Sequence, residues 1–514
     1  MSVQGSDGLD GLYGGSLALL TDLYQLTMAC GYWKAGVAER EAVFHLTFRR
    51  PPFGGGYALA AGLGPALEYL ERFRFTPDDL AYLGTLRDNA NEPLFPPGFL
   101  DYLGAMRWSC DVDAIAEGSL VFPHEPLIRV RGSILQAQLV ETPLLTILNF
   151  QTLIATKASR VVQAARGGAV LEFGLRRAQG LDGGLAASRA AYIGGTAATS
   201  NVLAGKLFGI PVRGTHAHSW VMFHGSELEA FRAYAEAMPG NCTFLVDTYD
   251  SIAGIAHAIT VGLELRAKGH ELAGIRLDSG DLAHISTEGR EMLDAAGFPN
   301  AKIVASNDLD EQLITSIIAQ GARIDTWGVG TKLVTAYDQP ALGGVYKLGA
   351  YRDQHGVWRD AVKLSEQPIK ISNPGILQVR RLRRGDEYVG DVIFDGERGL
   401  ATPLELHDIE DPLRPMISPQ ADTSEDLLAP VMRDGQRIGP RATLEQARAR
   451  AALELPRLSS RTRRTSNPQP YPVGLDRDVH ARKQALIANA RRIANPPVPS
   501  AAPAMRGAEP GEHL

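Results

Sequence analysis

Two histidines lie two positions apart in the stretch RGTHAHSW (213–220), directly after the short apolar run FGIPV. Imidazole titrates near neutral pH, so His216 and His218 can act as nucleophiles, proton carriers or metal ligands. The alternative is that each histidine only fills a hydrogen-bonding niche. Other polar residues of the chain occupy equivalent places after apolar runs, and this favours a functional role for the pair.

Short β-rich runs alternate with helical segments from about residue 155 onward. The segments between the runs carry apolar residues at helical spacing and end in glycine. This alternation is typical of an α/β protein in which helices cover a parallel sheet. Because six units occur without a dinucleotide-binding glycine motif, we expect an irregular βα barrel of parallel strands, with an open sheet as the alternative. The six runs are AVLEFG, IPVRGT, TFLVD, GIRLD, KIVAS and TWGVG.

Different patterns flank the predicted barrel, which we place at residues 156–370. The helical stretch TDLYQLTM, the strand AVFHLTF, the turn PPFGGGY and the stretch GSLVFPHEPLIRVRG, read as β-turn-β, indicate an α+β domain over 16–155. Strand-like runs return over 371–495, and we expect this segment to pack on the N-terminal domain and complete it. Residues 1–15 are rich in glycine and 496–514 in proline and alanine, so we expect a flexible N-terminus and a disordered tail.

Composition limits the partners and the compartment. The chain has 52 Lys and Arg against 58 Asp and Glu, a formal net charge of −6, so it lacks the basic field that nucleic acid or a membrane surface would require. Cys30, Cys110 and Cys242 have no CxxC spacing, which predicts neither a disulfide framework nor a zinc site. With no secretory signal and no apolar run of about 18 residues, we expect a cytoplasmic protein.

Polar residues or glycines follow every predicted strand, whereas the strand starts are plain. In a parallel βα barrel the reacting groups lie at these C-terminal ends, where the loops converge. This pattern predicts an enzyme. The residues are Arg176 and Arg177, Thr215, His216 and His218, Asp247 and Asp250, Arg276, Asp278, Ser279 and Asp281, Ser306 and Asn307, and Gly328, Gly330 and Thr331.

The types of these residues indicate an anionic ligand. The turn GVGTK (328–332), followed by glycines 343–344, can close backbone N–H groups around a phosphate with Lys332 nearby, although such turns are often only structural. Asp278 and Asp281 can hold Mg²⁺ or a sugar diol, or Asp281 can simply cap a helix. The chain has no GxxxxGK[ST] motif, so ATP would not be held in a P-loop.

Several stretches resemble, in order, the signatures of nicotinate phosphoribosyltransferase, a family of the type II phosphoribosyltransferases. The resemblance implies transfer of phosphoribosyl from 5-phosphoribosyl 1-pyrophosphate to nicotinate. The products are nicotinate mononucleotide and pyrophosphate, with coupled ATP hydrolysis and Mg²⁺ as cofactor, a step of NAD salvage. It also implies a homodimer whose active sites lie between subunits. The stretches are TDLYQLTM, EFGLRRAQG, IGGTAATSNVLAGKLFGIPVRGTHAHSW, GIRLDSGDL, ASNDLDE and GVGTKLVTAYDQPALGGVYKL.

The resemblance also implies residue roles. His218 is the histidine that ATP phosphorylates, and neutral imidazole is a competent nucleophile near pH 7. His216 orients its neighbour or packs into the strand wall, and we favour the second. Arg276 and Asp278 are the other implied catalytic residues, and Asp278 faces the ribose or, together with Asp281, holds the metal. The implied nicotinate-binding residues are Tyr24 from the partner subunit, Phe173, Arg176, Thr215 and Arg276, with the phosphoribosyl 5′-phosphate as the alternative ligand of Arg176. The implied phosphoribosyl pyrophosphate-binding residues are Thr331, Gly330, Gly328, Ser306, Asn307, Lys332, Gly343 and Gly344.

Other functions stay open as alternatives. A related enzyme that uses nicotinamide carries an acidic side chain just after the GT that follows the first βα unit, where this chain has Ala197, and this favours the acid over the amide. A quinolinate phosphoribosyltransferase would need more cationic groups. A barrel aldolase or isomerase would need a strand-end lysine or glutamate. A non-catalytic nucleotide-binding regulator would lack the key side chains that are present here.

Overall fold

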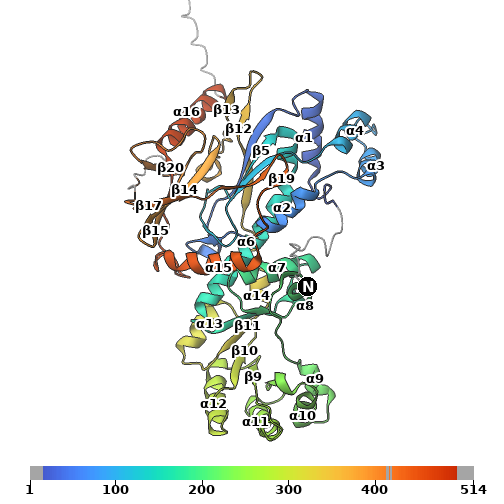
Figure 1. The fold of residues 1–514 in the computed structure, drawn as a ribbon, viewed down its shortest axis with the longest axis vertical. Helices are drawn as coiled ribbons and strands as arrows, with labels where there is room; N and C mark the ends of the chain where they lie inside the picture. Colours follow the sequence, from blue (N-terminus) through green and yellow to red (C-terminus); the bar gives the residue numbers. More distant parts are fainter. Residues whose placement is uncertain (1–15, 412–415, 417–418, 495–514) are drawn as a thin grey trace, which may run out of the picture.

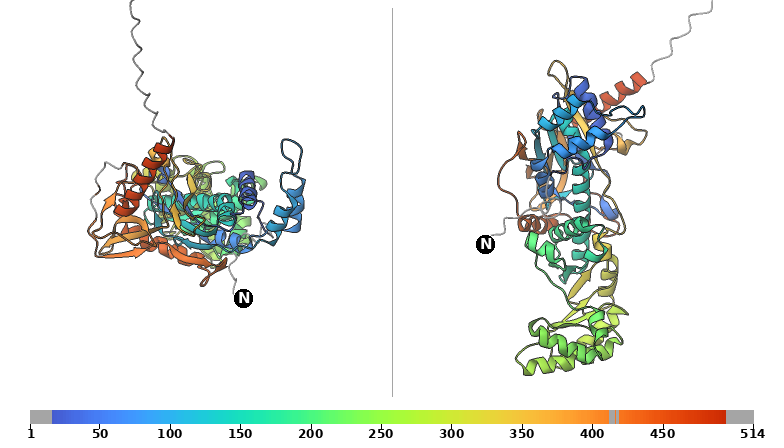
Figure 2. Two further views of the ribbon diagram at one scale, coloured as in Figure 1. Left: turned by 90° about the horizontal axis from the view of Figure 1, so that it is seen from above. Right: turned by 90° about the vertical axis from the view of Figure 1, so that its right-hand side faces the viewer.

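Two regions are stacked along the long axis of the molecule in the computed structural model (Figure 1). The structure describes residues 16–411, 416 and 419–494; the predicted flexible N-terminus and the predicted tail lie outside them. One region holds the barrel, which forms the lower end in the right-hand view of Figure 2, and the other holds the N-terminal and C-terminal segments. Within the described ranges, no helix combines the length and apolar character needed to cross a membrane.

The lower region contains a six-stranded parallel sheet with the strand order β7-β6-β11-β10-β9-β8. Strands that follow one another in the chain pair, except β7 and β8, and the last strand, β11, pairs with the first, β6. This order is that of a barrel with one open seam, so the predicted irregular βα barrel is confirmed. The strands are β6 (Ala169–Glu172), β7 (Ala198–Thr199), β8 (Thr243–Leu245), β9 (Gly274–Leu277), β10 (Lys302–Ala305) and β11 (Thr326–Val329).

The open seam lies where the run IPVRGT was predicted to form a full strand. Only Val212 makes a bridge there, beside Thr199 of β7. The side chain of His216 spans the gap to β8, because the backbone N–H of Leu245 donates to its Nε2 over 3.2 Å. Its ring is buried against Tyr234, 5.0 Å between centroids. His216 therefore takes the place of a ladder hydrogen bond at the seam.

Helices connect the barrel strands, and several begin at a polar residue that follows a strand. Asp250 and Asp281 cap their helices by accepting from the backbone N–H of Ala253 and His284. Such caps satisfy otherwise unpaired N–H groups at the helix start. The helices are α7 (Leu181–Ile193), α8 (Val202–Phe208), α9 (His218–Phe223), α10 (Glu227–Ala237), α11 (Ser251–Ala267), α12 (Leu282–Ala295), α13 (Glu311–Ala319) and α14 (Thr331–Val334).

The upper region is built on a seven-stranded sheet, β13-β12-β1-β5-β3-β18-β19. Strands β12 and β13 fall in the range predicted for the barrel, 156–370, but β12 pairs with β1 and β13 pairs with β12. The last barrel unit ends with α14. Helix α6 (Glu141–Ala164) runs from this region into the lower one (Figure 1). The strands are β1 (Glu41–Phe48), β3 (Asp111–Ala114), β5 (Ile128–Ser133), β12 (Gly344–Arg352), β13 (Trp358–Asp360), β18 (Ala429–Arg433) and β19 (Gln436–Arg437). The helices are α1 (Leu23–Lys34), α2 (Leu63–Arg72), α3 (Pro77–Thr85), α4 (Pro97–Ala105) and α5 (Ile134–Leu139).

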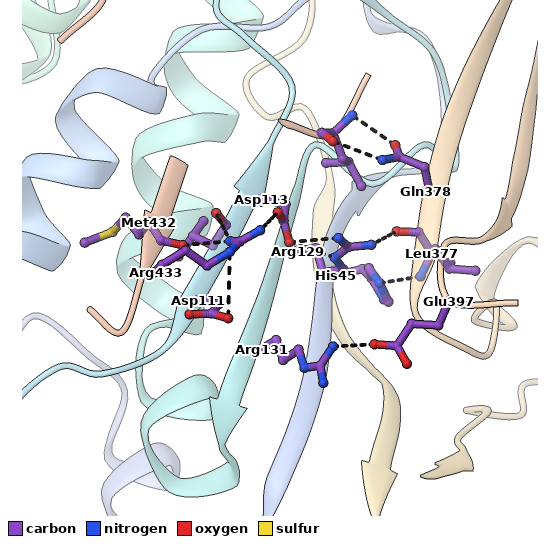
Figure 3. A network of polar contacts seen from close by, with 12 residues as sticks. His45, Asp111, Asp113, Arg129, Arg131, Leu377, Gln378, Glu397, Met432 and Arg433 are labelled. Atoms are coloured by element: carbon purple, nitrogen blue, oxygen red, sulfur yellow. Dashed lines mark hydrogen bonds and ion pairs between the residues drawn. The ribbon is translucent and has the colours of Figure 1, made fainter. Parts of the chain in front are cut away.

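The C-terminal segment packs on the N-terminal sheet through polar contacts (Figure 3). Arg129 of β5 donates to the carbonyl of Leu377, whose own N–H donates to Nε2 of the buried His45. Arg433 of β18 pairs with Asp113 at 2.6 Å. The segment also forms a five-stranded sheet and two helices: β14 (Leu377–Arg384), β15 (Glu387–Asp395), β16 (Leu406–His407), β17 (Thr423–Asp426), β20 (Val473–Asp476), α15 (Leu444–Glu454) and α16 (Arg477–Ala494).

Candidate active site

Arg276 organises the C-terminal rim of the barrel from its position in β9. Its Nε donates to the hydroxyl of Ser306 over 2.9 Å and its Nη1 to the hydroxyl of Thr215 over 3.1 Å. Its Nη2 donates to Oδ1 of Asp278 over 3.0 Å. The guanidinium carbon lies 5.6 Å from the centroid of the Phe173 ring. The structure thus brings five of the predicted site residues together, and three bonds from one rigid fork fix their orientation.

The carboxylate of Asp278 lies within a second set of hydrogen bonds. Oδ1 also accepts from the Ser306 hydroxyl. Burial opposes its ionisation, but the bond from Ser306 and the charge of Arg276 together hold the pKa of Asp278 below its ordinary value. The backbone N–H of Asp278 and the hydroxyl of Ser279 both donate to Oδ2 of Asp247, at 2.9 and 2.6 Å. The loops after β8 and β9 are therefore tied to each other.

His218 lies at the rim, with two-fifths of its side chain exposed. Its Nδ1 is 3.1 Å from the hydroxyl oxygen of Thr248, and its Nε2 is 3.8 Å from Oδ2 of Asp278. His216, in contrast, is buried, and burial with the nearby charge of Arg276 lowers its pKa to about 4. Since His216 also accepts from Leu245, it is neutral at physiological pH. An accessible imidazole at position 218 can act as a nucleophile.

The glycines of the predicted phosphate turn pack tightly behind Phe173. A Cβ at Gly328 would lie 2.7 Å from a ring carbon of Phe173, and one at Gly174 would lie 2.9 Å from the carbonyl oxygen of Gly330. The backbone of β11 can approach the turn after β6 only because these positions lack side chains. Thr331 follows as the first residue of α14, so its hydroxyl and the 328–330 backbone share the rim with Phe173.

Some predicted residues have other local roles in a single chain. Lys332 donates to Oδ2 of Asp310 over 2.5 Å, and this bond raises the pKa of Lys332. Asn307 follows β10 and has a φ of 122°, a strained value outside glycine. Three further groups of predicted residues make no contact with Arg276 among the described residues. Arg176 and Arg177 are in an exposed turn, and Asp281 caps α12. Gly343 and Gly344 lead into β12, where Gly344 lies beside Asn149.

Tyr24 lies on α1 in the upper region, away from the rim of its own barrel (Figure 1). Its side chain is 47% exposed. Burial of its hydroxyl end and the neighbouring carboxylate of Glu141 raise its pKa to about 12. A single chain therefore does not bring Tyr24 to Arg276 and Phe173.

The structure corrects the interpretation of Ala197. Its N–H donates to the carbonyl of Val170 over 2.7 Å, and it precedes β7. It therefore lies beside Val170 within β6, before the C-terminal ends of the strands, and is not one of the residues that form the rim. The polar residues that follow β7 are Ser200 and Asn201, and Nδ2 of Asn201 donates to the hydroxyl of Ser188 over 3.3 Å. The error arose because the start of a two-residue strand cannot be located from an Ala- and Thr-rich stretch.

Sequence reasoning also missed two residues. Thr248, which contacts His218, directly follows Asp247, the residue that ends the predicted strand TFLVD. Glu172 ends β6 and is fully buried, where it accepts from the N–H of Gly174 and the hydroxyls of Ser188 and Thr199. It anchors the turn that carries Phe173. The signal for Glu172 was present, because a lone acid in the apolar run AVLEFG requires internal partners.

These features define a class of protein before any comparison is made. The fold is a βα barrel with polar side chains converging on its C-terminal rim, as in barrel enzymes. A cationic fork beside an aromatic ring suits a flat anionic ligand, and the exposed imidazole of His218, 3.8 Å from the Asp278 carboxylate that the fork also binds, offers a nucleophile.

Comparison with known proteins identifies the family within this class. Residues 19–149 match the nicotinate phosphoribosyltransferase (NAPRTase) N-terminal domain, and residues 378–483 match the nicotinate phosphoribosyltransferase C-terminal domain. The nicotinate phosphoribosyltransferase of Bacillus subtilis is 44% identical over 477 residues, which cover 92% of this chain and 95% of that one. The human enzyme of that name is 37% identical, with 91% and 96% covered.

Solved structures agree with this result. The crystal structure of human nicotinic acid phosphoribosyltransferase matches with a TM-score of 0.79 at 34% identity, covering 91% of this chain and 99% of that one. A nicotinate-nucleotide pyrophosphorylase from Pyrococcus furiosus shares the fold, with a TM-score of 0.63 at 21% identity and coverage of 86% and 95%. The chain belongs to the nicotinate phosphoribosyltransferase family and is an enzyme of that type.

Proposed function

We propose that this chain transfers phosphoribosyl from 5-phosphoribosyl 1-pyrophosphate to nicotinate and couples the turnover to ATP through phosphorylation of His218. The products are nicotinate mononucleotide and pyrophosphate, which places the enzyme in NAD salvage. One observation carries the proposal: Arg276 and the exposed imidazole of His218 share the carboxylate of Asp278 as a neighbour. A carboxylate-binding group and a phosphate acceptor thus lie at one rim.

The nicotinate site is formed by Arg276, Phe173 and Thr215. A guanidinium has five N–H donors, and the bonds within the protein use three, so two are left for a ligand carboxylate. Phe173 offers a ring for the pyridine to stack against. Arg176, in the exposed turn that follows Phe173, adds positive charge near the entrance.

The transfer step needs little acid–base help from the protein. The pyridine nitrogen has a free lone pair that attacks C1 of the ribose as pyrophosphate leaves, and the sugar passes through an oxocarbenium-like state. Positioning and electrostatic stabilisation then account for the rate. In this proposal Thr331 and the 328–330 backbone hold the 5′-phosphate, and Ser306 and Asn307 lie beside the ribose.

Two carboxylates at the rim fit a Mg²⁺ ion. Among the residues that the structure describes, Oδ1 of Asp247 is buried without a hydrogen-bond partner, and the one contact of Oδ2 of Asp278 is with Nε2 of His218 at 3.8 Å. Within the described ranges no cluster of three or more His, Cys, Asp or Glu side chains could hold a metal. Mg²⁺ commonly takes one or two carboxylates and fills its other positions with phosphates and water. When bound, it would neutralise charge on the leaving pyrophosphate. Asp281 is the weaker candidate, since it caps α12.

We also propose a homodimer in the cytoplasm. In this assembly Tyr24 of the partner subunit completes the nicotinate site, which accounts for a side chain that is 47% exposed on α1 of the free chain. Leu20, Leu23 and Met28 are exposed on or beside the same helix, and burying them would favour association. The three cysteines are buried and unpaired, as suits a reducing compartment.

A direct assay tests the proposed function. Purified protein is incubated with 5-phosphoribosyl 1-pyrophosphate and, in separate reactions, nicotinate, nicotinamide or quinolinate, each with and without ATP. We expect the acid to be used, ATP to raise turnover, and His218→Ala to lose the ATP effect while keeping part of the basal transfer. His284→Ala, an exposed histidine of α12, is the control and should behave as wild type.

The other outcomes separate the alternatives. Equal use of the amide would overturn the choice of nicotinate, and turnover of quinolinate alone would assign the third pyridine substrate. Nucleotide binding without turnover of any of the three would indicate the non-catalytic regulator.

A further inference from the structure

The hydroxyl of Thr248 contacts the ring nitrogen of His218 that faces away from Asp278. The distance from Thr248 Oγ1 to His218 Nδ1 is 3.1 Å, and within the described part of the chain this hydroxyl has no other hydrogen-bond partner. Thr248 follows Asp247, whose Oδ2 binds the N–H of Asp278 and the hydroxyl of Ser279. The imidazole is thus held between two loops that are locked to each other.

The position of Asp278 decides which ring nitrogen of His218 has the lone pair. Oδ2 of Asp278 is 3.8 Å from Nε2. A carboxylate attracts an N–H and repels a lone pair, so in the neutral ring the proton is on Nε2 and the lone pair is on Nδ1. A hydroxyl that faces a lone pair donates to it. In the resting site Thr248 therefore donates to Nδ1.

We propose that Thr248 is a catalytic residue for phosphorylation of His218: its hydroxyl orients Nδ1 as the phosphoryl acceptor and then donates to an oxygen of the transferred phosphoryl group. This inference rests on the proposed function, because it takes ATP as the phosphoryl donor.

Phosphorylation of the ring conserves its atoms and electrons. Nδ1 attacks the γ-phosphorus of ATP, the Nδ1–P bond forms, and the P–O bond to the β-phosphate breaks with its electron pair going to ADP. The Nε2 proton stays on the ring beside Asp278. Once Nδ1 is bonded to phosphorus, the Thr248 hydroxyl loses its acceptor and turns to a phosphoryl oxygen. Hydrolysis returns the electron pair to Nδ1 as water attacks phosphorus, and a proton is released to solvent.

The test is a rapid-quench measurement of label transfer from [γ-³²P]ATP and Mg²⁺ to the full-length protein. Thr248→Val keeps the shape of the side chain and removes the hydroxyl. Loss of one donor to a developing phosphoryl charge should slow labelling about 100-fold, whereas Thr248→Ser should stay within about threefold of wild type. The control is Thr243→Val, at the opposite end of β8, which should label at the wild-type rate. ³¹P NMR of the labelled protein should place the phosphoryl group on Nδ1.

Each outcome decides the proposal. If Thr248→Val labels as fast as wild type, or the phosphoryl group is on Nε2, the role of Thr248 is wrong while the ATP coupling stands. If the wild type takes no label, or His218→Ala takes as much, the ATP coupling itself is wrong and the role of Thr248 falls with it. Thr248→Ala, compared by its thermal unfolding midpoint, separates slow labelling from misfolding: a variant that folds as wild type and labels slowly supports the proposal.

Discussion

The two histidines of RGTHAHSW, although only one residue lies between them, have opposite environments. His218 faces the rim, whereas the ring of His216 is buried against Tyr234 and accepts a backbone hydrogen bond from β8. A histidine that closes the barrel seam can do so only when its Nε2 is unprotonated. Its structural role and its low pKa therefore have the same cause, and both can be tested through stability.

The stability of the protein should depend on pH through His216. Its pKa is lowered from 6.5 to about 4 in the folded state, so between these values the unfolded chain binds a proton that the folded chain does not. The free energy of unfolding therefore falls as pH decreases from about 6.5 to about 4, by at most about 3 kcal/mol. His216→Gln keeps an acceptor for Leu245 but does not titrate. Urea unfolding at pH 7, 6 and 5 should show a shallower pH dependence for this variant.

The exposed His284 provides the matched control for this measurement. His284→Gln should keep the wild-type pH dependence, since 72% of that side chain is accessible to solvent. Other buried histidines, such as His45, affect wild type and variant equally and cancel in the comparison. Equal slopes for wild type and His216→Gln would show that His216 is not held neutral by the fold.

At the scale of elements, a buried ion cluster joins helix α6 to the segments that carry the predicted phosphate site. Lys157 of α6 lies 2.7 Å from Glu311 of α13 and 2.5 Å from Asp338 in the loop after α14. Arg160, one turn along α6, also pairs with Glu311, at 2.8 Å. The loop that follows Thr331 is thereby fixed to the helix that connects the two regions.

Removing Lys157 should destabilise the protein far more than removing an exposed lysine. Its side chain is fully buried, so Lys157→Met leaves Glu311 and Asp338 with less charge compensation and should lower the free energy of unfolding by about 3 kcal/mol. The double variant Lys157→Met/Glu311→Gln should recover part of that loss, because it removes the buried negative charge. Denaturant unfolding of the single and double variants measures both effects.

Lys302 is the control for the Lys157 variants. It pairs with Asp325 at 3.1 Å but is 63% exposed, so Lys302→Met should change the free energy of unfolding by less than about 1 kcal/mol. Equal losses for the two lysine variants, or no recovery in the double variant, would contradict the argument from burial.

Local patterns predicted the barrel units well because each unit shows in the hydrophobic periodicity of its own residues. The same patterns could not predict strand pairing, which joins distant residues. Thus Val212 was expected to lie within a full strand, and β12 was expected in the barrel although it pairs with β1. The same contrast between local patterns and contacts of distant residues applies to the candidate site. Arg276 and its neighbours were predicted from strand ends, whereas Thr248 became visible only when β8 and the 213–218 segment were placed side by side.

At the scale of the whole molecule, the two regions separate groups that the proposed reaction needs together. Tyr24 lies on α1 of the upper region, and the rim with Arg276 lies in the lower one (Figure 1). No described contact joins them within one chain. A two-fold dimer that sets the upper region of one subunit against the barrel of the other would bring both to one site, and each subunit would then contribute to two active sites.

A heterodimer of two defective chains tests this arrangement. Arg276→Lys cannot reproduce three hydrogen bonds from one planar fork and should lower kcat/KM about 100-fold, and Tyr24→Ala should lower it about tenfold through loss of ring contact. One chain of each kind, carrying different tags, is co-expressed and the mixed dimer is purified. If Tyr24 serves the partner's barrel, one site of the mixed dimer has both residues and the other has neither, so the dimer should regain about half of the wild-type activity. If Tyr24 serves its own barrel, both sites are defective, and the mixed dimer should be no more active than the Tyr24→Ala homodimer. Because both results come from the same two substitutions, a general loss of folding cannot imitate the recovery.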